Sequence, residues 1–418
     1  MSLEKTSAGL LFGWLKQAPP ASRRALVAAS LGWMLDSFDV MLYALVLAHL
    51  MKDLGMGKGT AGLLGSLTLV AAAAGGIIFG IVADKLGRTW ALRASILIYS
   101  VFTAACGLAQ TVPMLALFRI FLGLGMGGEW ASGAALVSET WPAEHRGKAL
   151  GLVQSSWAVG YAAAALVTAL VLPRWGWRAV FFIGVLPALV VFWVQKKVEE
   201  PAIWRMQKKS TPQEQKLKVG SIIRGRLLGT TVAVTLMNAF TLFAWWGFNL
   251  WIPGYLSLAK SQGGIGLSTR RTSSLIIFMQ LGMWLGYLTF GYISDTLGRK
   301  KTYIIYLLAA ALFVFAYSGF HKPLFLFFLG PFVAFFGTGY FSGFGALTAE
   351  LYPTRIRATL QGFTYNVGRV VSAVAPLAIG SLAQEKGFGR AFMLASGAFV
   401  LAAVMWFWIP ETRGRALE

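Results

Sequence analysis

Two aspartates lie in the first long apolar stretch, residues 26–50, which is long enough to span a membrane. Asp36 and Asp39 are three residues apart, a spacing that puts both on roughly one face of a helix. A carboxyl in an apolar environment, with a second carboxyl nearby, is suited to binding and releasing a proton near neutral pH. The pair is therefore predicted to be a proton-coupling site, because ionisable residues inside membrane segments are functional by default. The alternative is a buried ion pair that only holds the helices together.

One arginine stands inside an apolar segment near the other end of the chain, in residues 358–384. An unpaired guanidinium at this depth is costly, so Arg369 must face a cavity, an acid or an anionic ligand. Its planar fork matches a carboxylate in a bidentate manner. Arg369 is therefore predicted to anchor the substrate, with Tyr365 and Asn366 adding hydrogen bonds. The alternative is a fixed salt bridge across the bundle.

Other polar residues interrupt the apolar segments. Glu129 is predicted to be a second proton site or the partner of a cation, and these alternatives stay open. Arg119 is predicted to reach Asp39 at the proton site, to extend outward to the membrane surface or to take part in helix packing, and these alternatives stay open. Three amides are further candidates for substrate binding, although each can equally bond a neighbouring helix: Gln154, Asn249 and Gln280. The tryptophans at positions 245, 246 and 251 can line a pocket or anchor the membrane interface.

A motif of glycine, aspartate and arginine occurs twice in the chain, 211 residues apart. The repeated residues are Gly80, Asp84, Arg88, Glu139 and Arg146 in the first copy, and Gly291, Asp295, Arg299, Glu350 and Arg357 in the second. Glycine lets two helices approach closely, and an aspartate can pair with a nearby arginine. Two copies at a constant offset favour a gating role. The alternative is a structural loop with basic anchors.

Charges that occur in only one copy are better candidates for chemistry than the repeated ones, which we interpret as scaffold. Asp39 has no acidic counterpart, because the best local match in residues 227–252 places Asn249 there. The residue at the position equivalent to Arg369 is Ala158. This asymmetry indicates that one half contributes the proton site and the other half the anion site.

Composition assigns the chain to the membrane proteins, because 57% of its residues are hydrophobic and only 13% are charged. We expect twelve spanning segments, at residues 26–50, 60–83, 91–110, 113–138, 149–171, 176–195, 227–252, 272–294, 302–319, 323–349, 358–384 and 389–409. A parallel duplication of membrane segments is typical of transporters whose site lies between the halves. The predicted fold is all-α, with two six-helix bundles at 1–195 and 227–418 and a basic linker at 196–226.

The net charge of +21 does not indicate a nucleic-acid-binding protein, because the basic residues are unevenly distributed. Most of them fall in the loops that share one side of the membrane with the termini, and nine lie between Lys196 and Arg226. The positive-inside rule then predicts that both termini are cytoplasmic. We find no nucleotide-binding loop, metal motif or catalytic triad in a plausible context. The sequence therefore predicts neither an enzyme nor a protein with a cofactor.

The repeated motif supports a family assignment. Gly80-Ile-Val-Ala-Asp84-Lys-Leu-Gly87-Arg88 and its copy Gly291-Tyr-Ile-Ser-Asp295-Thr-Leu-Gly298-Arg299 resemble the signature loop of the major facilitator superfamily. The stretch from Arg119 to Gly128 is similar to that superfamily's fourth-helix motif, which implies that Arg119 tunes a nearby proton site. Pro410-Glu411-Thr412 is similar to the superfamily's usual tail. The resemblance covers nearly the whole chain. It implies two six-helix bundles, alternating access and a monomer.

A narrower resemblance concerns the substrate. Gly128-Glu129-Trp-Ala-Ser-Gly and Gly176-Trp177-Arg178-Ala179 resemble the sialate:proton symporters, a group that also includes fungal lactate permeases. Leu35-Asp36-Ser37-Phe38-Asp39 is similar to the acidic pair of that family and of the aromatic acid:proton symporters. Residues 196–226 are too polar and short for the two extra central helices of bacterial sialate members. The lactate group's seventh-helix motif is also absent.

Together these features predict an inner-membrane symporter that imports a small organic acid, such as lactate or pyruvate, with a proton. An aromatic-acid or sugar-acid symporter is the alternative within transport. An exchanger, an efflux transporter and a non-transporting receptor also stay open, because a fold alone does not set direction or activity. The predicted partners are a small organic anion, a proton and the lipid bilayer.

Overall fold

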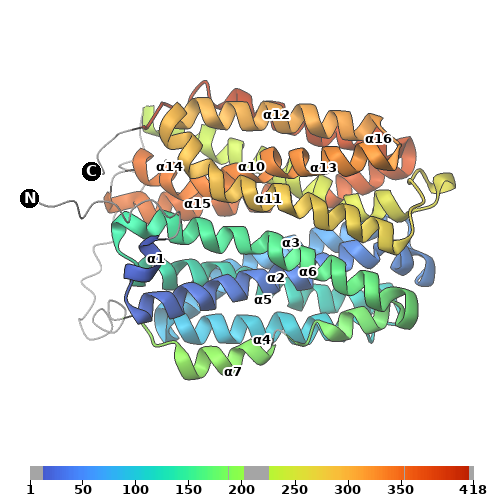
Figure 1. The fold of residues 1–418 in the computed structure, drawn as a ribbon, viewed down its shortest axis with the longest axis horizontal. Helices are drawn as coiled ribbons and strands as arrows, with labels where there is room; N and C mark the ends of the chain where they lie inside the picture. The colour runs from blue at the N-terminus through green and yellow to red at the C-terminus, as the bar shows by residue number, and fades with distance from the viewer. Residues whose placement is uncertain (1–12, 187, 202–225, 353, 414–418) are drawn as a thin grey trace, which may run out of the picture.

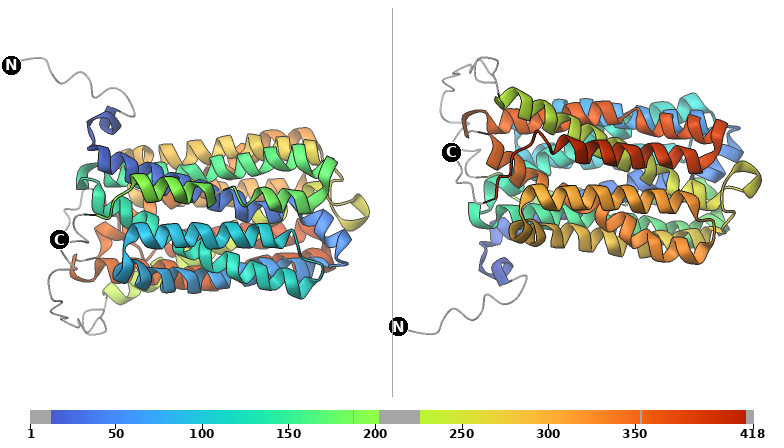
Figure 2. Two further views of the ribbon diagram at one scale, coloured as in Figure 1. Left: turned by 90° about the horizontal axis from the view of Figure 1, so that it is seen from below. Right: turned by 90° about the horizontal axis from the view of Figure 1, so that it is seen from above.

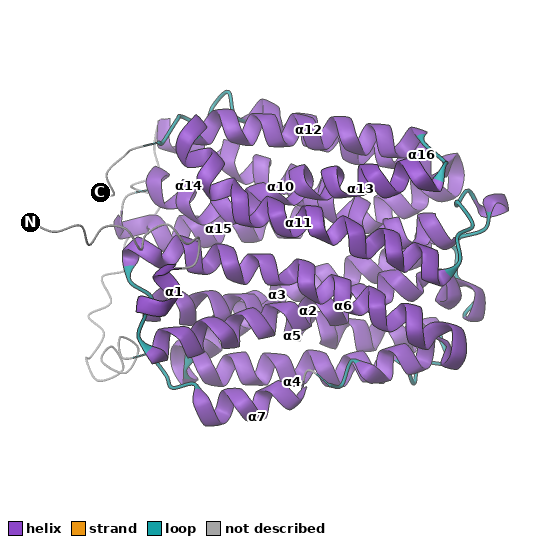
Figure 3. Ribbon diagram, viewed as in Figure 1, coloured by secondary structure: helices purple, strands orange, loops and turns teal. Residues whose placement is uncertain are grey.

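The computed structural model describes residues 13–186, 188–201, 226–352 and 354–413, and the regular elements in these ranges are helices (Figure 3). The first half of the chain forms α1 (Gly13–Gln17), α2 (Pro20–Asp53), α3 (Lys58–Leu86), α4 (Arg88–Cys106), α5 (Val112–Thr140), α6 (Ala143–Ile183) and α7 (Ala188–Lys197). The second half forms α10 (Arg226–Ser257), η1 (Lys260–Gln262), α11 (Thr269–Leu297), α12 (Arg299–Gly319), α13 (Pro323–Thr338), η2 (Gly339–Gly343), α14 (Phe344–Leu351), α15 (Thr354–Ser372) and α16 (Ala375–Met405).

The two halves lie side by side, with the helices of the first half along one side of the molecule and those of the second along the other (Figure 1). Figure 2 shows the same long helices running parallel to one axis in two further views. We call the end that carries α1 and α14 the terminal end, and the opposite end, which carries η1, the distal end. The predicted linker at 196–226 falls mostly outside the described residues.

Ten helices among the described residues are long and apolar enough to cross a membrane. Two of them contain a break at a glycine with positive φ: α6 at Gly176 (φ 74°) and α16 at Gly387 (φ 80°). This left-handed conformation is readily available only to glycine and ends a helical run. Each of these helices therefore supplies parts of two spans, which is compatible with the twelve segments expected from the sequence.

The outer surface of the bundle is apolar, which explains how the fold exists in lipid. Large aliphatic and aromatic side chains are exposed along the helices, including Ile77, Ile78, Leu170, Leu312 and Phe328. Exposed apolar surface of this extent is incompatible with a soluble monomer. The helices satisfy their own backbone hydrogen bonds, as the hydrocarbon core requires. The chain is thus a multi-pass membrane protein with an all-α fold.

The duplication seen in the sequence is also present in the backbone geometry. Six glycines with positive φ form three pairs separated by the same 211 residues: Gly55 and Gly266 (63° and 78°), Gly87 and Gly298 (119° and 98°), and Gly176 and Gly387 (74° and 80°). Each pair marks a turn between two consecutive helices. The halves therefore share their turn chemistry as well as their motifs.

Close helix packing repeats at the same offset. A Cβ added to Gly75 in α3 would meet the Leu124 carbonyl oxygen of α5, and one added to Gly286 in α11 would lie 2.6 Å from the Phe335 carbonyl oxygen of α13. The sequence had placed this close approach at Gly80 and its copy Gly291. That expectation is wrong, because nothing lies within 4 Å of a Cβ added at Gly80 or at Gly291. The contact is made more than one helical turn closer to the middle of each helix, at Gly75 and Gly286.

Gly286→Val is expected to lower the thermal unfolding temperature of the detergent-solubilised protein by several degrees, because overpacking a tight contact costs about 1–3 kcal/mol. Tryptophan fluorescence during heating measures this change. Gly291→Val, one turn further along the same helix, is the matched control and should leave the temperature unchanged. Equal unfolding temperatures for the two variants would show that α11 and α13 can move apart without a loss of stability.

Candidate functional site

Three carboxyl side chains are buried inside the first half and form what we call the central acidic cluster. Asp36 and Asp39 come from the middle of α2 and Glu129 from α5, and their exposed fractions are 0%, 0% and 1%. Tyr99 of α4 lies close enough to interact electrostatically with all three. The structure thus brings together the acidic pair and the third acid predicted from the sequence.

The cluster lacks the partners that buried carboxylates ordinarily have. Neither oxygen of Asp36 or Asp39 has a hydrogen-bond partner in the described part of the chain, and Oε2 of Glu129 also lacks one. The Thr103 hydroxyl lies beside Asp39, but it donates its hydrogen to the Tyr99 carbonyl oxygen at 2.8 Å. Buried polar groups without partners are rare and mark places where a proton, water or ligand belongs. The expectation of a fixed ion pair at Asp39 thus finds no support in this geometry.

The position of Glu129 depends on small residues around it. A Cβ added to Gly32 of α2 would collide with Oε1 of Glu129, and one added to Gly133 would lie 3.3 Å from the same atom. Glu129 also interacts electrostatically with Asp36. The glycines therefore let a third carboxyl approach the aspartate pair from α5.

Arg369 supplies a positive charge from the second half. It lies near the end of α15 with 5% of its surface exposed, and it interacts electrostatically with Asp36 and Tyr365. None of the ion pairs among the described residues includes Arg369. The guanidinium therefore faces the acidic side of the first half without being tied to one carboxylate. An anion from solution can compete for its fork, which a fixed bidentate pair would prevent.

Arg119 is packed inside the bundle and neither extends to the surface nor pairs with Asp39. Its guanidinium stacks on the Tyr43 ring at 3.7 Å, and only 1% of the residue is exposed, so it does not extend to the surface. Its Nε and Nη1 atoms have no hydrogen-bond partner among the described residues, and it makes no ion pair there with Asp39. Cys106 interacts electrostatically with both Arg119 and Asp39. Any influence of Arg119 on Asp39 must therefore act without direct contact.

The predicted amides divide into free and engaged side chains. Gln280 is buried with both polar atoms unpartnered, and Asn249 has an unpartnered Oδ1 while its Nδ2 lies 3.5 Å from Met41 Sδ in the opposite half. Asn366 donates to the Gly362 carbonyl oxygen of its own helix at 2.9 Å. Gln154 lies within hydrogen-bonding reach of Tyr287 across the two halves. Gln280 and Asn249 are thus the amides best able to accept a ligand.

Four tryptophans form a connected row across both halves, which we call the tryptophan ladder. Trp33 lies between Trp130 and Trp157, with ring centroids 4.6 and 4.7 Å away, and Trp157 meets Trp246 of the second half edge-on at 5.9 Å. Sequence reasoning singled out Trp246 but missed the other three. A signal was present, because Trp130 follows Glu129 directly and Trp33 lies one helical turn before Asp36. The ladder places broad aromatic surface beside the central acidic cluster.

The residues of the repeated motif form two equivalent ionic clusters at the terminal end. Arg88 pairs with Asp84 and, at 2.9 Å, with Glu139. Arg299 likewise pairs with Asp295 and, at 3.0 Å, with Glu350. Each cluster lies within one half, so neither ties the two halves together directly. Arg146 is exposed at this end, and the side chain of Arg357 lies outside the described residues.

Sequence reasoning missed one member of each ionic cluster. Glu200 accepts hydrogen bonds from the backbone N–H groups of Thr89 and Trp90, and Glu411, 211 residues later, accepts them from Arg299 and Lys300. A carboxylate at a helix N-terminus is favourable because it meets free N–H groups and the positive end of the helix dipole. Partial burial raises the pKa of Glu411, but the backbone donors outweigh it and the net shift is downward.

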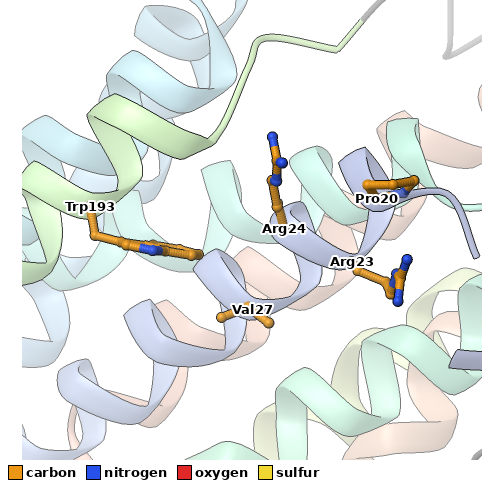
Figure 4. A pocket seen from close by; sticks show the side chains of 5 residues that line it. All are labelled: Pro20, Arg23, Arg24, Val27 and Trp193. Carbon is orange, nitrogen blue, oxygen red and sulfur yellow. The ribbon is translucent and has the colours of Figure 1, made fainter. Parts of the chain in front are cut away.

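Two hollows at the molecular surface lie away from this centre. One, of about 250 Å³, is lined at the terminal end by Pro20, Arg23, Arg24, Val27 and Trp193 (Figure 4). The other, of about 410 Å³, lies at the distal end beside Lys58 and Gln262. No group of three or more metal-ligating side chains occurs in the described part of the chain. The candidate site is the region where the central acidic cluster of the first half approaches Arg369 of the second, together with the tryptophan ladder that connects the two halves.

Comparison with known proteins places the chain among membrane transporters. A family model described as the Major Facilitator Superfamily matches residues 29–267 and 234–418. The chain is 33% identical to a probable 4-methylmuconolactone transporter of Cupriavidus pinatubonensis, over 98% of this chain and 95% of that protein. It is 32% identical to the sialic acid transporter NanX of Escherichia coli, over 95% and 96%. The inward open xylose transporter XylE from E. coli has the same fold, with a TM-score of 0.72 at 20% identity over 94% and 97%.

Proposed function

Because the chain belongs to the major facilitator superfamily, we propose that it is a transporter that imports a small organic carboxylate together with a proton. The observation that carries this proposal is a set of buried ionisable side chains, contributed by both halves, that form no ion pair with one another. Asp36 and Asp39 belong to one half, Arg369 belongs to the other, and no ion pair among the described residues joins them. Such an arrangement provides one place for a proton and another for an anion.

The transport cycle follows from the cost of moving charge through a low-dielectric interface. A proton enters at Asp36 or Asp39, and the substrate carboxylate then docks on Arg369. With both charges neutralised, the halves can move past one another without burying an uncompensated charge. The ionic clusters around Arg88 and Arg299 rearrange as the terminal end opens. The inward proton gradient then drives accumulation.

We propose that the protein lies in the inner (plasma) membrane, with its terminal end facing the cytoplasm. The support is the excess of basic residues on the side of the membrane that holds the termini, which includes Arg88, Arg299, Lys300 and the run between Lys196 and Arg226. This is the distribution that the positive-inside rule describes for cytoplasmic loops.

A monocarboxylate such as lactate or pyruvate suits the single guanidinium of Arg369. A planar unsaturated or aromatic acid is the second candidate, and the tryptophan ladder favours it, because flat ligands stack on aromatic rings. The relative named for 4-methylmuconolactone supports the planar class, and NanX supports a sugar acid. These three chemical classes are separated by the experiment that follows.

We expect the pH outside de-energised proteoliposomes to rise when the correct acid is added, because each entering anion takes a proton inward. The acids to compare are lactate, pyruvate, benzoate, cis,cis-muconate and sialic acid, with protein-free liposomes as the control for passive entry. A rise in external pH with only one class of acid identifies the substrate class. Binding or radiolabel exchange without any proton movement would replace symport with exchange, efflux or a receptor role.

A further inference from the structure

Lys58, the first residue of α3, is a cation that the transport cycle above does not use. It is 9% exposed, and its Nζ donates to the Gln262 carbonyl oxygen at 2.6 Å and to the Ala383 carbonyl oxygen at 3.1 Å. Its Nζ also lies 5.0 Å from the centre of the Phe388 ring. All three partners belong to the second half of the chain. No carboxylate among the described residues pairs with Lys58.

The contacts around Lys58 continue along a seam between α3 and α16. The Gly59 N–H donates to Gln384 Oε1 at 3.0 Å, and the Leu377 N–H donates to Ser66 Oγ at 3.2 Å. A Cβ added to Gly62 would meet the Pro376 carbonyl oxygen, so the two helices touch with no side chain between them. The seam therefore closes the interface between the halves over about two turns of α3.

This seam lies at the distal end, whereas the ionic clusters at the terminal end each stay within one half. Gln262 belongs to η1, the short element at the distal end in Figure 1. Lys58 also has no counterpart in the duplication, because the residue 211 positions later is Thr269. Charges that occur in only one of the two repeats are better candidates for function than charges that occur in both. Lys58 is therefore a candidate for function.

We propose that Lys58 is the positioning residue that locks the distal end in its closed state. An ammonium bound to carbonyl dipoles suits this task, because both carbonyls belong to the opposite half and leave together when that half moves. Water can then replace each bond, so the lock opens and closes without stranding a buried ion pair. The inference assumes that the halves rock as proposed above, but it does not depend on which acid is carried.

The test measures opening of the distal end directly, in the full-length protein in membrane vesicles. Leu250 of α10 is 1% exposed, and its side chain lies 3.2 Å from a Cβ placed on Gly65 of α3, so it reports on the seam. In a Cys106→Ala background, Leu250→Cys should react slowly with a membrane-impermeant maleimide. Adding Lys58→Met should increase the rate of labelling from the distal side roughly ten-fold. The reason is that the closed state loses a stabilisation of about one charged hydrogen bond.

Two further variants separate a lock from simple damage. Lys58→Arg keeps a cation that can reach the same carbonyls and should restore slow labelling. Lys52→Met removes an exposed positive charge from the same end and should leave labelling unchanged. If Lys58→Met does not insert into the membrane, Gln384→Ala removes the neighbouring contact to Gly59 and should give the same change to a smaller extent.

Unchanged labelling in Lys58→Met, or an equal increase in Lys52→Met, would overturn the lock. The measurement uses neither a substrate nor a proton gradient. A failure of the lock is therefore distinguishable from a failure of the proposed symport.

Discussion

Arg369→Ala is expected to reduce uptake of the substrate acid about 100-fold or more, because two charge-assisted hydrogen bonds to a carboxylate are lost. Initial rates of radiolabelled uptake into proteoliposomes measure the effect. Arg369→Lys should recover only part of the activity, since an ammonium keeps the charge but lacks the planar fork. The loss should appear in substrate binding as well as in transport, because the arginine is proposed to touch the anion.

The control for Arg369→Ala is Arg174→Ala, which removes an exposed arginine from α6 and should leave uptake unchanged. The unfolding temperature of Arg369→Ala should not fall, because removing a buried cation that has no ion-pair partner relieves a desolvation cost. Uptake by Arg369→Ala within two-fold of the unchanged protein would exclude substrate anchoring. A large drop in unfolding temperature would indicate instead the fixed structural bridge that the sequence left open.

The sequence predicted the helices of this fold well but located their ends poorly. The apolar stretch at 26–50 corresponds to most of α2, which extends to Pro20 and Asp53 because polar and charged residues continue the helix at both ends. The segment at 323–349 is divided into α13, η2 and α14, where glycines between residues 337 and 345 interrupt the α-helix. Hydropathy reports burial in lipid and does not report such interruptions.

The site was partly predictable because the duplication separates scaffold from chemistry. Asp36 and Arg369, neither of which has a charged equivalent in the other half, lie close enough to interact electrostatically, and Asp39 lies beside Asp36 in the first half. The contacts of Lys58 were not predictable, because its partners lie more than two hundred residues away in the opposite half. Trp33 and Trp130 lie close to the predicted acids in the sequence, but the ring contacts of the tryptophan ladder join residues on different helices and could not be predicted from the sequence. Glu200 could have been predicted from the sequence, because it lies 211 residues before Glu411, the same offset as that of the repeated motif.

Asp39→Asn is expected to abolish proton-driven accumulation while leaving exchange of labelled for unlabelled substrate across the membrane. Asparagine has nearly the same shape as aspartate but cannot release a proton, so the coupling ion loses its site. Exchange should survive because Arg369 interacts electrostatically with Asp36, and the anion site is therefore left intact. With an imposed gradient of about one pH unit, the accumulation ratio should fall from about ten toward one.

Asp53→Asn is the matched control for this prediction. Asp53 ends α2 at the distal end, where it accepts hydrogen bonds from Trp177 and Arg178 at 3.0 and 2.9 Å, so its loss should leave coupling unchanged. Full accumulation by Asp39→Asn would contradict this assignment. The proton-binding residue would then be Asp36 or Glu129, the other members of the central acidic cluster. Measuring accumulation by Asp36→Asn and by Glu129→Gln then decides between these two carboxyls. Only Asp36→Asn should also alter substrate affinity, because Asp36 is the carboxyl that interacts with Arg369.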